Sequence, residues 1–304
     1  MEKVKYGKFA LPYIIDIMNK RKISYSLNGT YSGKCVIVQG ENKNIIFWDY
    51  PFNINTSSSI KVCKNKDICT HFLKINGLSV PNSENFTRLN KQINSDLIPL
   101  MYDFITTEKI HNKGIEYPFI IKPSTLSQGE GIKKINSLSD ALSYFDQINN
   151  IDCKTFIIQE FCKGNDYRVV VLGNTILQAY QRVPFHIIGD GTSKIYDLVE
   201  KKIEEFKNND RDKLVDINDS RIWDSVLLKG KTKNDILKPN EKLVLQELAN
   251  LSLGGTSVDI TNKISNYYKE IAIKTAQKLN LDLCGIDIIA EDLTDDKKKT
   301  SIKY

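Results

Sequence analysis

Residues 117–135, YPFIIKPSTLSQGEGIKKI, decide the fold prediction because they place a lysine at the end of an apolar strand and a glycine loop just beyond it. The apolar run at residues 119–121 predicts a buried strand, and residues 132–135 predict the strand that follows. Between these strands, residues 127–131 predict a hairpin with little side-chain bulk. Such a loop can offer backbone N–H groups to a polyphosphate while Lys122 supplies a positive charge.

A glycine-containing hairpin after a lysine also occurs in proteins that bind no phosphate, and this alternative stays open for the segment taken alone. The order GxxxxGK[ST] of a Walker loop is absent from it. The segment is not a dinucleotide fingerprint either, because no third glycine follows and a strand rather than a helix comes next. Its interpretation therefore depends on the motifs that follow it.

The composition is that of an ordinary globular protein, with 41% apolar and 26% charged residues in a chain of 304. This length suffices for two or three modest lobes. No apolar run approaches the roughly 20 residues that a membrane-spanning helix needs. The N-terminal segment is interrupted by Pro12 and Asp16, and no small-residue cleavage site follows it. We therefore expect a cytoplasmic protein without a membrane partner.

The charge and the cysteines narrow the classes of ligand. The net charge of +6 is spread along the chain, which favours anionic ligands such as nucleotides and also weak nucleic-acid binding. A nucleic-acid-binding module has little support, because the chain has neither a basic and aromatic stripe nor a recognisable DNA-binding motif. The six cysteines form no CxxC pair and the three histidines do not cluster with them, which indicates reduced, partly buried thiols rather than a zinc site or a disulfide framework.

The N-terminal region carries no catalytic constellation. Residues 35–38 and 45–48 predict two strands, and residues 53–59, NINTSSS, predict a polar linker with a domain boundary at its end. After the linker, Asp67 can begin a helix that Gly77 ends.

Beyond the glycine loop, strands alternate with helices and hairpins in a mixed order. The expected strands are residues 155–161, 167–172, 176–183 and 283–290, and the expected helices are residues 140–148, 193–206 and 266–279. Ser139 and Ser265 are the expected N-caps of the first and last of these helices. Residues 207–240 are polar and lysine-rich and predict an excursion with little core. The order of elements argues for α+β lobes rather than a doubly wound sheet.

A single carboxylate, Asp287, interrupts the apolar strand expected at residues 283–290. A charge in a buried strand is costly unless it is paired or bound to a metal, so Asp287 is a candidate Mg²⁺ ligand. The alternative is an acid at a strand end that forms a salt bridge to a lysine, and the strand alone does not decide between them.

Five stretches of the chain, taken in order, resemble the motifs of the ATP-grasp ligases. They are KPSTLSQGEGI, IIQEFCKGNDYRVVVLG, AYQRVPFHIIGDG, NLSLGGTSVDIT and LCGIDII. Within that superfamily the chain looks most like cyanophycin synthetase and the ATP-grasp domain of bifunctional glutathione synthetases. The resemblance covers residues 61–304, and five ordered motifs are far more specific than any one of them. Residues 1–60 lie outside it.

The resemblance implies an α+β ATP-grasp fold in which two α+β subdomains clamp a nucleotide. The expected domains are residues 1–60, a short N-terminal pre-grasp region that contains β-strands; residues 61–160, the N-terminal subdomain with the glycine lid; and residues 161–304, the C-terminal subdomain.

The resemblance also implies a nucleotide site. Lys66 and Lys122 match the two lysines that reach ATP phosphates, and Asp166 matches the acid that hydrogen-bonds the ribose. The other expected nucleotide contacts are the lid residues Ser127, Gly129 and Gly131 and the hinge residues Gln159, Glu160, Phe161 and Cys162, whose backbone groups edge the adenine. On residue type alone, Lys66 could equally be a solvated lysine.

The expected catalytic residues follow from the same resemblance. Arg168 and Arg182 match arginines near the transferred phosphoryl group, where planar cationic donors let a carboxylate approach another anion. Without the resemblance, each would be an exposed charge on a strand face. Asn250 and Ser252, with the glycines that follow them, match the loop that holds the acyl phosphate or substrate carboxylate.

The implied reaction uses ATP and Mg²⁺. Phosphoryl transfer to a substrate carboxylate gives an acyl phosphate, and an amine then attacks its carbonyl to form an amide. The substrates would be amino acids or small peptides, and the habit of the family suggests a homodimer.

The chain departs from the family pattern in two places. The family follows the strand of Asp287 with a further strand whose Glu-x-Asn motif completes the Mg²⁺ shell, and the sequence ends at residues 299–304, about where that strand would begin. We expect a fragment truncated before this strand. Gln246 stands where the relatives carry an arginine before the NLS loop, which affects the charge or pose of the acyl substrate.

Three functional hypotheses follow from these observations. The leading one is an ATP-dependent carboxylate–amine ligase acting on amino acids or a peptide. The motif NLSLGG fits a glutathione-synthetase-like ligase acting on γ-glutamylcysteine equally well. From a different class, the chain could be an ATP-binding pseudoenzyme that regulates a partner.

Overall fold

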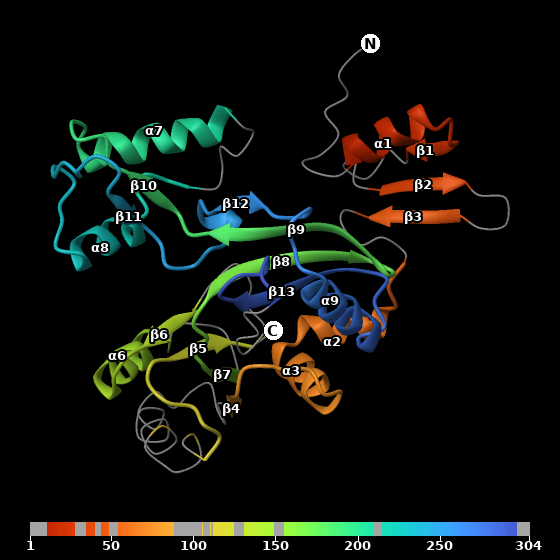
Figure 1. Ribbon diagram of the computed structural model, residues 1–304, viewed down its shortest axis with the longest axis horizontal. Coiled ribbons are helices and arrows are strands. Elements are labelled where there is room, and N and C mark those ends of the chain that lie inside the picture. Colours follow the sequence, from red (N-terminus) through yellow and green to blue (C-terminus); the bar gives the residue numbers. More distant parts are fainter. Residues whose placement is uncertain are drawn as a thin grey trace.

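The computed structural model describes residues 11–27, 35–39, 44–48, 54–87, 105, 110, 112–124, 131–148, 155–208 and 215–296. Helices and antiparallel strands alternate along this part of the chain (Figure 1), which confirms the predicted α+β class. The helices are α1 (Leu11–Lys20), α2 (Ser57–Lys64), α3 (Lys66–Ile75), α6 (Leu138–Ile148), α7 (Ile195–Asn208), α8 (Ser220–Leu228), α9 (Asn266–Lys278) and the 3₁₀ turn η1 (Leu251–Leu253). The strands are β1 (Tyr25–Leu27), β2 (Cys35–Gln39), β3 (Asn44–Trp48), β4 (Ser83–Thr87), β5 (Phe119–Pro123), β6 (Lys133–Ile135), β7 (Thr155–Glu160), β8 (Asn165–Leu172), β9 (Thr175–Val183), β10 (His186–Ile188), β11 (Lys242–Val244), β12 (Thr256–Asp259) and β13 (Leu283–Ala290).

The first large sheet contains the lysine strand from which the fold prediction began. Its order is β4-β7-β5-β6, and every pair in it is antiparallel. Side chains alternate across β5, so Phe119 and Ile121 point into a buried cluster with α6 while Lys122 lies on the other face. The two strands expected on either side of the glycine loop are confirmed.

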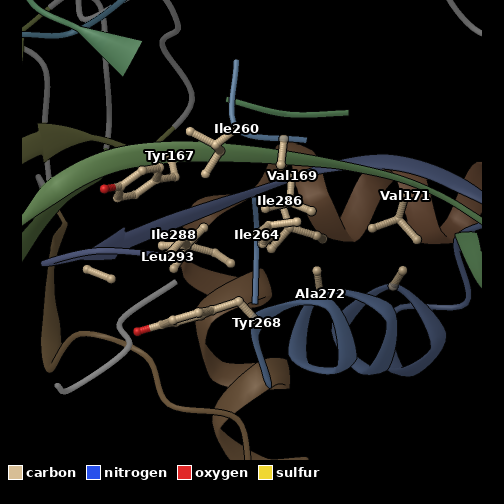
Figure 2. Close-up of a cluster of buried hydrophobic side chains, with 13 residues drawn as sticks. Tyr167, Val169, Val171, Ile260, Ile264, Tyr268, Ala272, Ile286, Ile288 and Leu293 are labelled. Carbon is tan, nitrogen blue, oxygen red and sulfur yellow. The ribbon is translucent and has the colours of Figure 1, made fainter. Parts of the chain in front are cut away.

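The second large sheet has the order β12-β9-β8-β13 and is also antiparallel. The residues Tyr167, Val169 and Val171 of β8 are buried and face α9, where they meet Tyr268 and Ala272 (Figure 2). Burial of each large apolar side chain stabilises the fold by about 1.5–3 kcal/mol relative to exposure. Because neighbouring residues of a strand point to opposite faces, β8 presents its even-numbered side chains on the side away from α9.

The two large sheets are joined by a short connection, residues 161–164, between β7 and β8. Gly164 in this connection has a φ of +143°, and a Cβ atom there would lie 2.8 Å from the backbone carbon and oxygen of Ala290. A glycine is therefore required for the connection to pass so close to the end of β13.

The prediction of a polar linker at residues 53–59 is wrong. Thr56 caps α2 by accepting a hydrogen bond from the N–H of Ser59 at 3.2 Å, and α2 runs through the expected domain boundary at residue 60. The run of serines hid the helix, because serine favours caps and turns over helix interiors. The division of the chain into three domains stays a prediction.

Helices α2 and α3 are attached to the second sheet near β13. Leu73 and Leu78 share a buried cluster with Leu279 and Leu281, which lie between α9 and β13. Asn55, just before α2, strengthens this attachment: its side chain donates to the carbonyl of Leu283 at 2.7 Å and accepts from two backbone N–H groups. The segment that contains α2 and α3 is therefore attached to the second sheet, whereas β5 belongs to the first.

The prediction that residues 207–240 form an excursion with little core is also wrong. This region contains α8, whose residues Ile222, Trp223 and Val226 are buried. They belong to a third cluster with α7 and the two-stranded sheet of β10 and β11. The indole N–H of Trp223 donates to the carbonyl of Ile217 at 2.7 Å, so the ring is both packed and hydrogen-bonded. A few apolar residues at helical spacing are enough to anchor a polar segment.

Helix α6 begins two residues earlier than predicted. Its first-turn N–H, on Asp140, donates to the hydroxyl of Ser137 at 3.1 Å, so Ser137 and not Ser139 provides the capping oxygen. Ser265 precedes α9 as expected, but its side chain makes no capping hydrogen bond.

The N-terminal region forms α1 and a separate three-stranded sheet, β1-β2-β3, in which the two predicted strands pair with each other. In the described part of the chain, every helix is too short or too polar to cross a membrane.

Candidate functional site

Two lysines meet at the end of β5. The Nζ atom of Lys122 donates a hydrogen bond to Oε1 of Gln159, on the neighbouring strand β7, at 2.6 Å. The Nζ atom of Lys66, the first residue of α3, donates to the carbonyl of Pro123, the last residue of β5, at 3.3 Å. The structure thus brings together the two lysines that were predicted to contact phosphate.

Burial and the charge of Lys66 both contribute to a shift in the pKa of Lys122. Burial, and after it the charge of Lys66, lowers the pKa of Lys122 from its usual 10.5 to about 8. Both causes act against the charged form of the amine. An anion bound beside both lysines would favour that charged form, so the site is poised electrostatically for a negatively charged ligand.

The hinge residues lie at the end of β7 and directly after it, and Glu160 and Phe161 make contacts within the protein. Glu160 pairs with Asn82: its carboxylate accepts from the Asn82 N–H at 3.1 Å, and its own N–H donates to the Asn82 carbonyl at 2.9 Å. The Nζ atom of Lys134 lies 4.2 Å from the ring centre of Phe161, a cation–π contact. Burial raises the pKa of the Cys162 thiol to about 11, so this cysteine is neutral at physiological pH.

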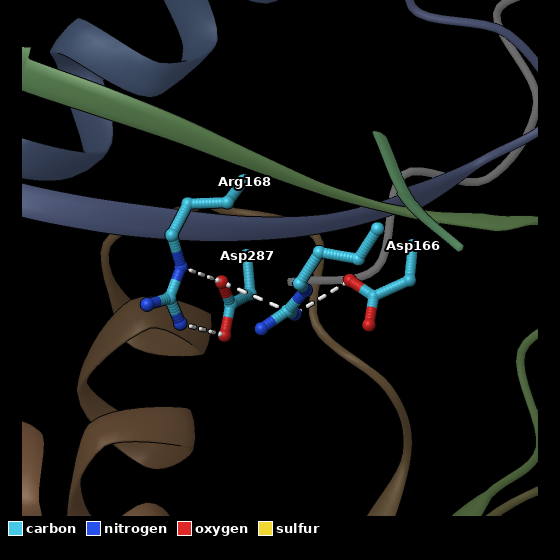
Figure 3. Close-up of polar contacts among 4 residues, drawn as sticks. Asp166, Arg168 and Asp287 are labelled. Atoms are coloured by element: carbon cyan, nitrogen blue, oxygen red, sulfur yellow. Dashed lines mark hydrogen bonds and ion pairs between the residues drawn. The ribbon is translucent and has the colours of Figure 1, made fainter. Parts of the chain in front are cut away.

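Two acids and two arginines form a quartet on the face of the second sheet away from α9 (Figure 3). The strand register creates it, because Asp166 of β8 pairs with Arg182 of β9, and Arg168 of β8 pairs with Asp287 of β13. Arg168 donates to both oxygens of Asp287, at 2.7 and 2.9 Å, in a bidentate geometry. The Nη2 atom of Arg182 lies 2.6 Å from Oδ1 of Asp166 and 3.3 Å from Oδ1 of Asp287.

The charges of the quartet balance, but one of its hydrogen-bond donors has no partner. Burial raises the pKa of Asp166, and the charge of Arg182 opposes this effect. The hydrogen bond to Asp287 raises the pKa of Arg168. The side chain of Arg182 is only 12% exposed, and its Nε atom is buried without a hydrogen-bond partner. A buried donor of this kind is costly, so Arg182 has unused capacity for a ligand acceptor.

The glycine loop before β12 lies against the same sheet. Asn250 precedes η1, and its carbonyl accepts from the N–H groups of Leu253 and Gly255 at 3.0 and 3.1 Å. A Cβ atom on Gly255 would lie 2.8 Å from that carbonyl and 3.0 Å from the carbonyl of Val183. This close approach fixes the loop beside the residue that follows Arg182.

Of the remaining predicted residues, some lie within the described part of the chain and others outside it. Ser127 and Gly129 lie outside the described residues. Ser252 is the central residue of η1, and Gly131, at a φ of +66°, accepts a hydrogen bond from the hydroxyl of Tyr144 at its carbonyl. Gln246 is 9% exposed, so its neutral side chain is buried where the resemblance led us to expect an arginine in the relatives.

The donor set around Asp287 fits Mg²⁺ only in part. A carboxylate is a ligand that Mg²⁺ accepts, and this ion usually takes one or two carboxylates together with phosphate oxygens and waters. Within the described residues, however, no group of three Asp, Glu, His or Cys side chains gathers, and both oxygens of Asp287 are engaged by arginine. Asp287 could therefore supply one ligand.

Residues 72–266 match the protein family described as "D-ala D-ala ligase C-terminus". The match covers more than half of the chain. The chain belongs to this family. Its ATP-grasp fold is thereby established, and the resemblance inferred from the five motifs is confirmed.

Curated relatives of this ligase-family chain are much longer than it. It is 30% identical over 199 residues to the glutathione biosynthesis bifunctional protein GshAB of Listeria welshimeri, covering 60% of this chain and 24% of that protein. It is 32% identical over 183 residues to cyanophycin synthetase of Geminocystis herdmanii, covering 59% of this chain and 21% of that protein. The chain thus spans about a quarter of the length of the relatives it matches.

A solved structure supports the fold of this family member. The crystal structure of a bifunctional glutathione synthetase from Pasteurella multocida superposes with a TM-score of 0.59 over 93% of this chain and 36% of that chain, at 20% identity. At this identity the likeness concerns the fold.

The sequence motifs did not reveal that the acids and arginines pair with each other. Asp287 was expected to bind Mg²⁺ or to pair with a lysine. In the structure it pairs with two arginines, and its role as a metal ligand stays a prediction. The i, i+2 spacing of Asp166 and Arg168 does place them on one strand face. The partners on β9 and β13 depend on register, which this spacing does not encode.

Proposed function

We propose that the chain is the nucleotide-binding part of an ATP-dependent carboxylate–amine ligase that acts on amino-acid or small-peptide substrates through an acyl phosphate. The observation that carries this proposal is the meeting of Lys66 and Lys122, one attached to each large sheet, at a single point that favours an anion. Membership of the ligase family supports it.

The proposed nucleotide pose follows from the connection between the sheets. The phosphates would lie between Lys66 and Lys122, with the lid residues Ser127, Gly129 and Gly131 above them. The adenine would lie against the hinge at Gln159, Glu160, Phe161 and Cys162. Asp166 is the quartet residue nearest in sequence to the hinge, and it would then contact the ribose.

The arginines are proposed to exchange partners during the reaction. Arg168 and Arg182 are neutralised by Asp287 and Asp166. An incoming phosphate or carboxylate would compete for these donors, and the buried Nε of Arg182 offers the first unused one. Two planar cations could in this way hold an anionic acceptor close to the anionic γ-phosphate, while Asn250 and Ser252 hold the substrate carboxylate from the neighbouring loop.

Mg²⁺ bound to the nucleotide would supply charge neutralisation at the transferred phosphoryl group. In this chain Asp287 would hold it, once Arg168 and Arg182 turn toward the anions. The Mg²⁺ ion would then replace the two arginines as the partner of the Asp287 carboxylate.

The substrate proposal covers two classes. The relatives are named for glutathione biosynthesis and for cyanophycin synthesis. The substrate whose carboxylate accepts the phosphoryl group would be γ-glutamylcysteine in the first class and a growing peptide in the second. We further propose a cytoplasmic protein, and a homodimer on family habit alone.

The test is Mg²⁺-dependent ADP release by this chain, measured separately with γ-glutamylcysteine plus glycine and with pooled amino acids and dipeptides. Turnover in either arm supports the ligase and selects its substrate class. Binding of ATP without ADP release in any arm, also by a version of the chain extended with the Glu-x-Asn strand, would favour the pseudoenzyme. Failure to bind ATP would overturn the proposal. Lys278→Met, which changes an exposed lysine at the end of α9, is the control for nonspecific charge effects.

A further inference from the structure

Three thiols gather beneath the turn between α2 and α3. Cys63 lies in the last turn of α2, Cys69 lies in α3, and Cys284 lies on β13. All three are free, half-buried thiols that pack against the cluster of Leu73 and Leu281. The proposed ligase chemistry uses none of them.

Two of these thiols are in direct contact. The side chains of Cys63 and Cys69 are hydrogen-bonded to each other, which lowers the pKa of Cys63 and raises the pKa of Cys69. Cys63 is therefore the sulfur of this pair that becomes a thiolate more readily. Burial instead raises the pKa of Cys284 to about 11. Because the thiolate is the nucleophile in thiol–disulfide exchange, Cys63 is the thiol of the three best suited to react first.

The contacting pair encloses one of the two site lysines. Only Asn65 separates α2 from α3, and its side chain caps α3 by accepting from the N–H groups of Asp67 and Ile68, each at 3.1 Å. Lys66 is the next residue. A bond between the two sulfurs would close a ring of residues 63–69 around this capped turn, with Lys66 at its centre.

We propose that Cys63 and Cys69 form a reversible disulfide that controls the position of Lys66 and thereby nucleotide binding. The oxidant is a low-molecular-weight disulfide such as oxidised glutathione. The Cys63 thiolate attacks one sulfur of the oxidant and expels one small thiol. Cys69, after losing its proton, attacks the Cys63 sulfur of this mixed disulfide, forms the S–S bond and releases the second small thiol.

The disulfide must disturb the turn because its geometry differs from that of the contact. An S–S bond is about 2.05 Å long and holds its dihedral angle near 90°, whereas a thiol–thiol hydrogen bond spans a longer distance without that constraint. Closing the gap draws the end of α2 toward α3. With a single residue between the helices, the movement reaches the Asn65 cap and the Lys66 amine at Pro123.

The test treats the reduced protein with oxidised glutathione, maps disulfides by mass spectrometry of non-reduced peptides, and measures ATP affinity before and after. We expect a Cys63–Cys69 cross-link, ATP affinity at least about tenfold weaker, and recovery with dithiothreitol. Cys69→Ser should stop at the mixed disulfide on Cys63. Cys284→Ser should still form the cross-link, and the double variant Cys63→Ser, Cys69→Ser should keep its ATP affinity in the oxidant.

The outcomes distinguish failure of this inference from failure of the proposed function. Only the claim that the disulfide controls nucleotide binding rests on the proposed function. A stable mixed disulfide in the unaltered protein, a Cys63–Cys284 bond, or no oxidation would overturn the thiol pair whatever the ATP result. A mapped Cys63–Cys69 bond with unchanged ATP affinity would overturn the control of binding. A reduced protein that binds no ATP would overturn the proposed function and, with it, the claim that the disulfide controls nucleotide binding. The disulfide map would still show whether Cys63 and Cys69 form a disulfide.

Discussion

Lys122 offers a test in which stability and binding should change in opposite directions. Its pKa is lowered from 10.5 to about 8, by burial first and by the charge of Lys66 second. Because the pKa of the folded form lies below that of the unfolded form, the charged lysine opposes folding at neutral pH. This penalty shrinks as the pH rises from about 8 to about 10.5, where the unfolded chain still holds the proton that the folded chain has lost.

The size of the penalty follows from the pKa. One pKa unit corresponds to about 1.4 kcal/mol, so at pH 7 the charge on Lys122 costs the folded state about 3 kcal/mol. Lys122→Met keeps a long apolar side chain and removes the charge. It also removes the hydrogen bond to Gln159, which takes back about 1 kcal/mol. We therefore expect the ligand-free variant to be more stable by about 2 kcal/mol at pH 7, with a gain that vanishes near pH 10.

The assay is urea unfolding of both proteins without nucleotide at pH 7 and pH 10, with Lys278→Met as the exposed-lysine control. The control should show no gain at either pH. Addition of ATP at pH 7 should then stabilise the unaltered protein more than Lys122→Met, because the variant binds ATP more weakly. A variant that is less stable at pH 7, or a difference that does not narrow at pH 10, would refute the account of Lys122.

Three further predictions concern the two large sheets and the glycine loop before β12. ATP affinity should fall about tenfold from pH 7 to pH 9 as Lys122 loses its proton, and calorimetry of Lys122→Arg should show a flat profile because a guanidinium stays charged; an equal fall in the variant would exclude Lys122 as the cause. Asp287→Asn should reduce ADP release at least about 100-fold. It should change stability by no more than about 1 kcal/mol in thermal unfolding, because the Arg168–Asp287 pair is over a third exposed; unchanged ADP release would remove Asp287 from the mechanism. Gly255→Ala should cost about 1–3 kcal/mol in urea unfolding because its Cβ would meet backbone oxygens at 2.8 Å. Gly230→Ala, which has open space around it, should cost only about 1 kcal/mol for its left-handed backbone, and equal costs would contradict the close approach at Gly255.

The positions of many strands along the chain could be predicted because apolar runs and turns encode them locally. The strand expected at residues 283–290 is β13 with the same bounds, and the lysine strand lies where the glycine loop placed it. The predictions for two segments were wrong because their apolar residues are few and stand among polar ones. The serine run of α2 resembles a linker, and the apolar residues of α8 stand in a polar stretch, so both helices depend on tertiary packing more than on local sequence.

The candidate site could be predicted in part. The two lysines were predicted from the resemblance to the ATP-grasp ligases, and the structure brings them together at Pro123 and Gln159. The partners of Asp287 were not predicted, since cross-strand neighbours are set by register between strands more than a hundred residues apart. The contact between Cys63 and Cys69 was missed for a related reason. A search for CxxC spacing does not find thiols that meet across a turn between two helices.

The central claim is that Lys66 and Lys122 together bind the polyphosphate of a nucleotide. Calorimetric titration of the reduced protein with ATP and with AMP, in the presence of Mg²⁺, tests it most directly when repeated on Lys66→Met, Lys122→Met and the control Lys278→Met. We predict that ATP binds far more tightly than AMP, that each site variant loses at least about tenfold in ATP affinity, and that the control loses none. Equal affinity for ATP and AMP, or site variants that bind ATP as tightly as the control, would contradict the account.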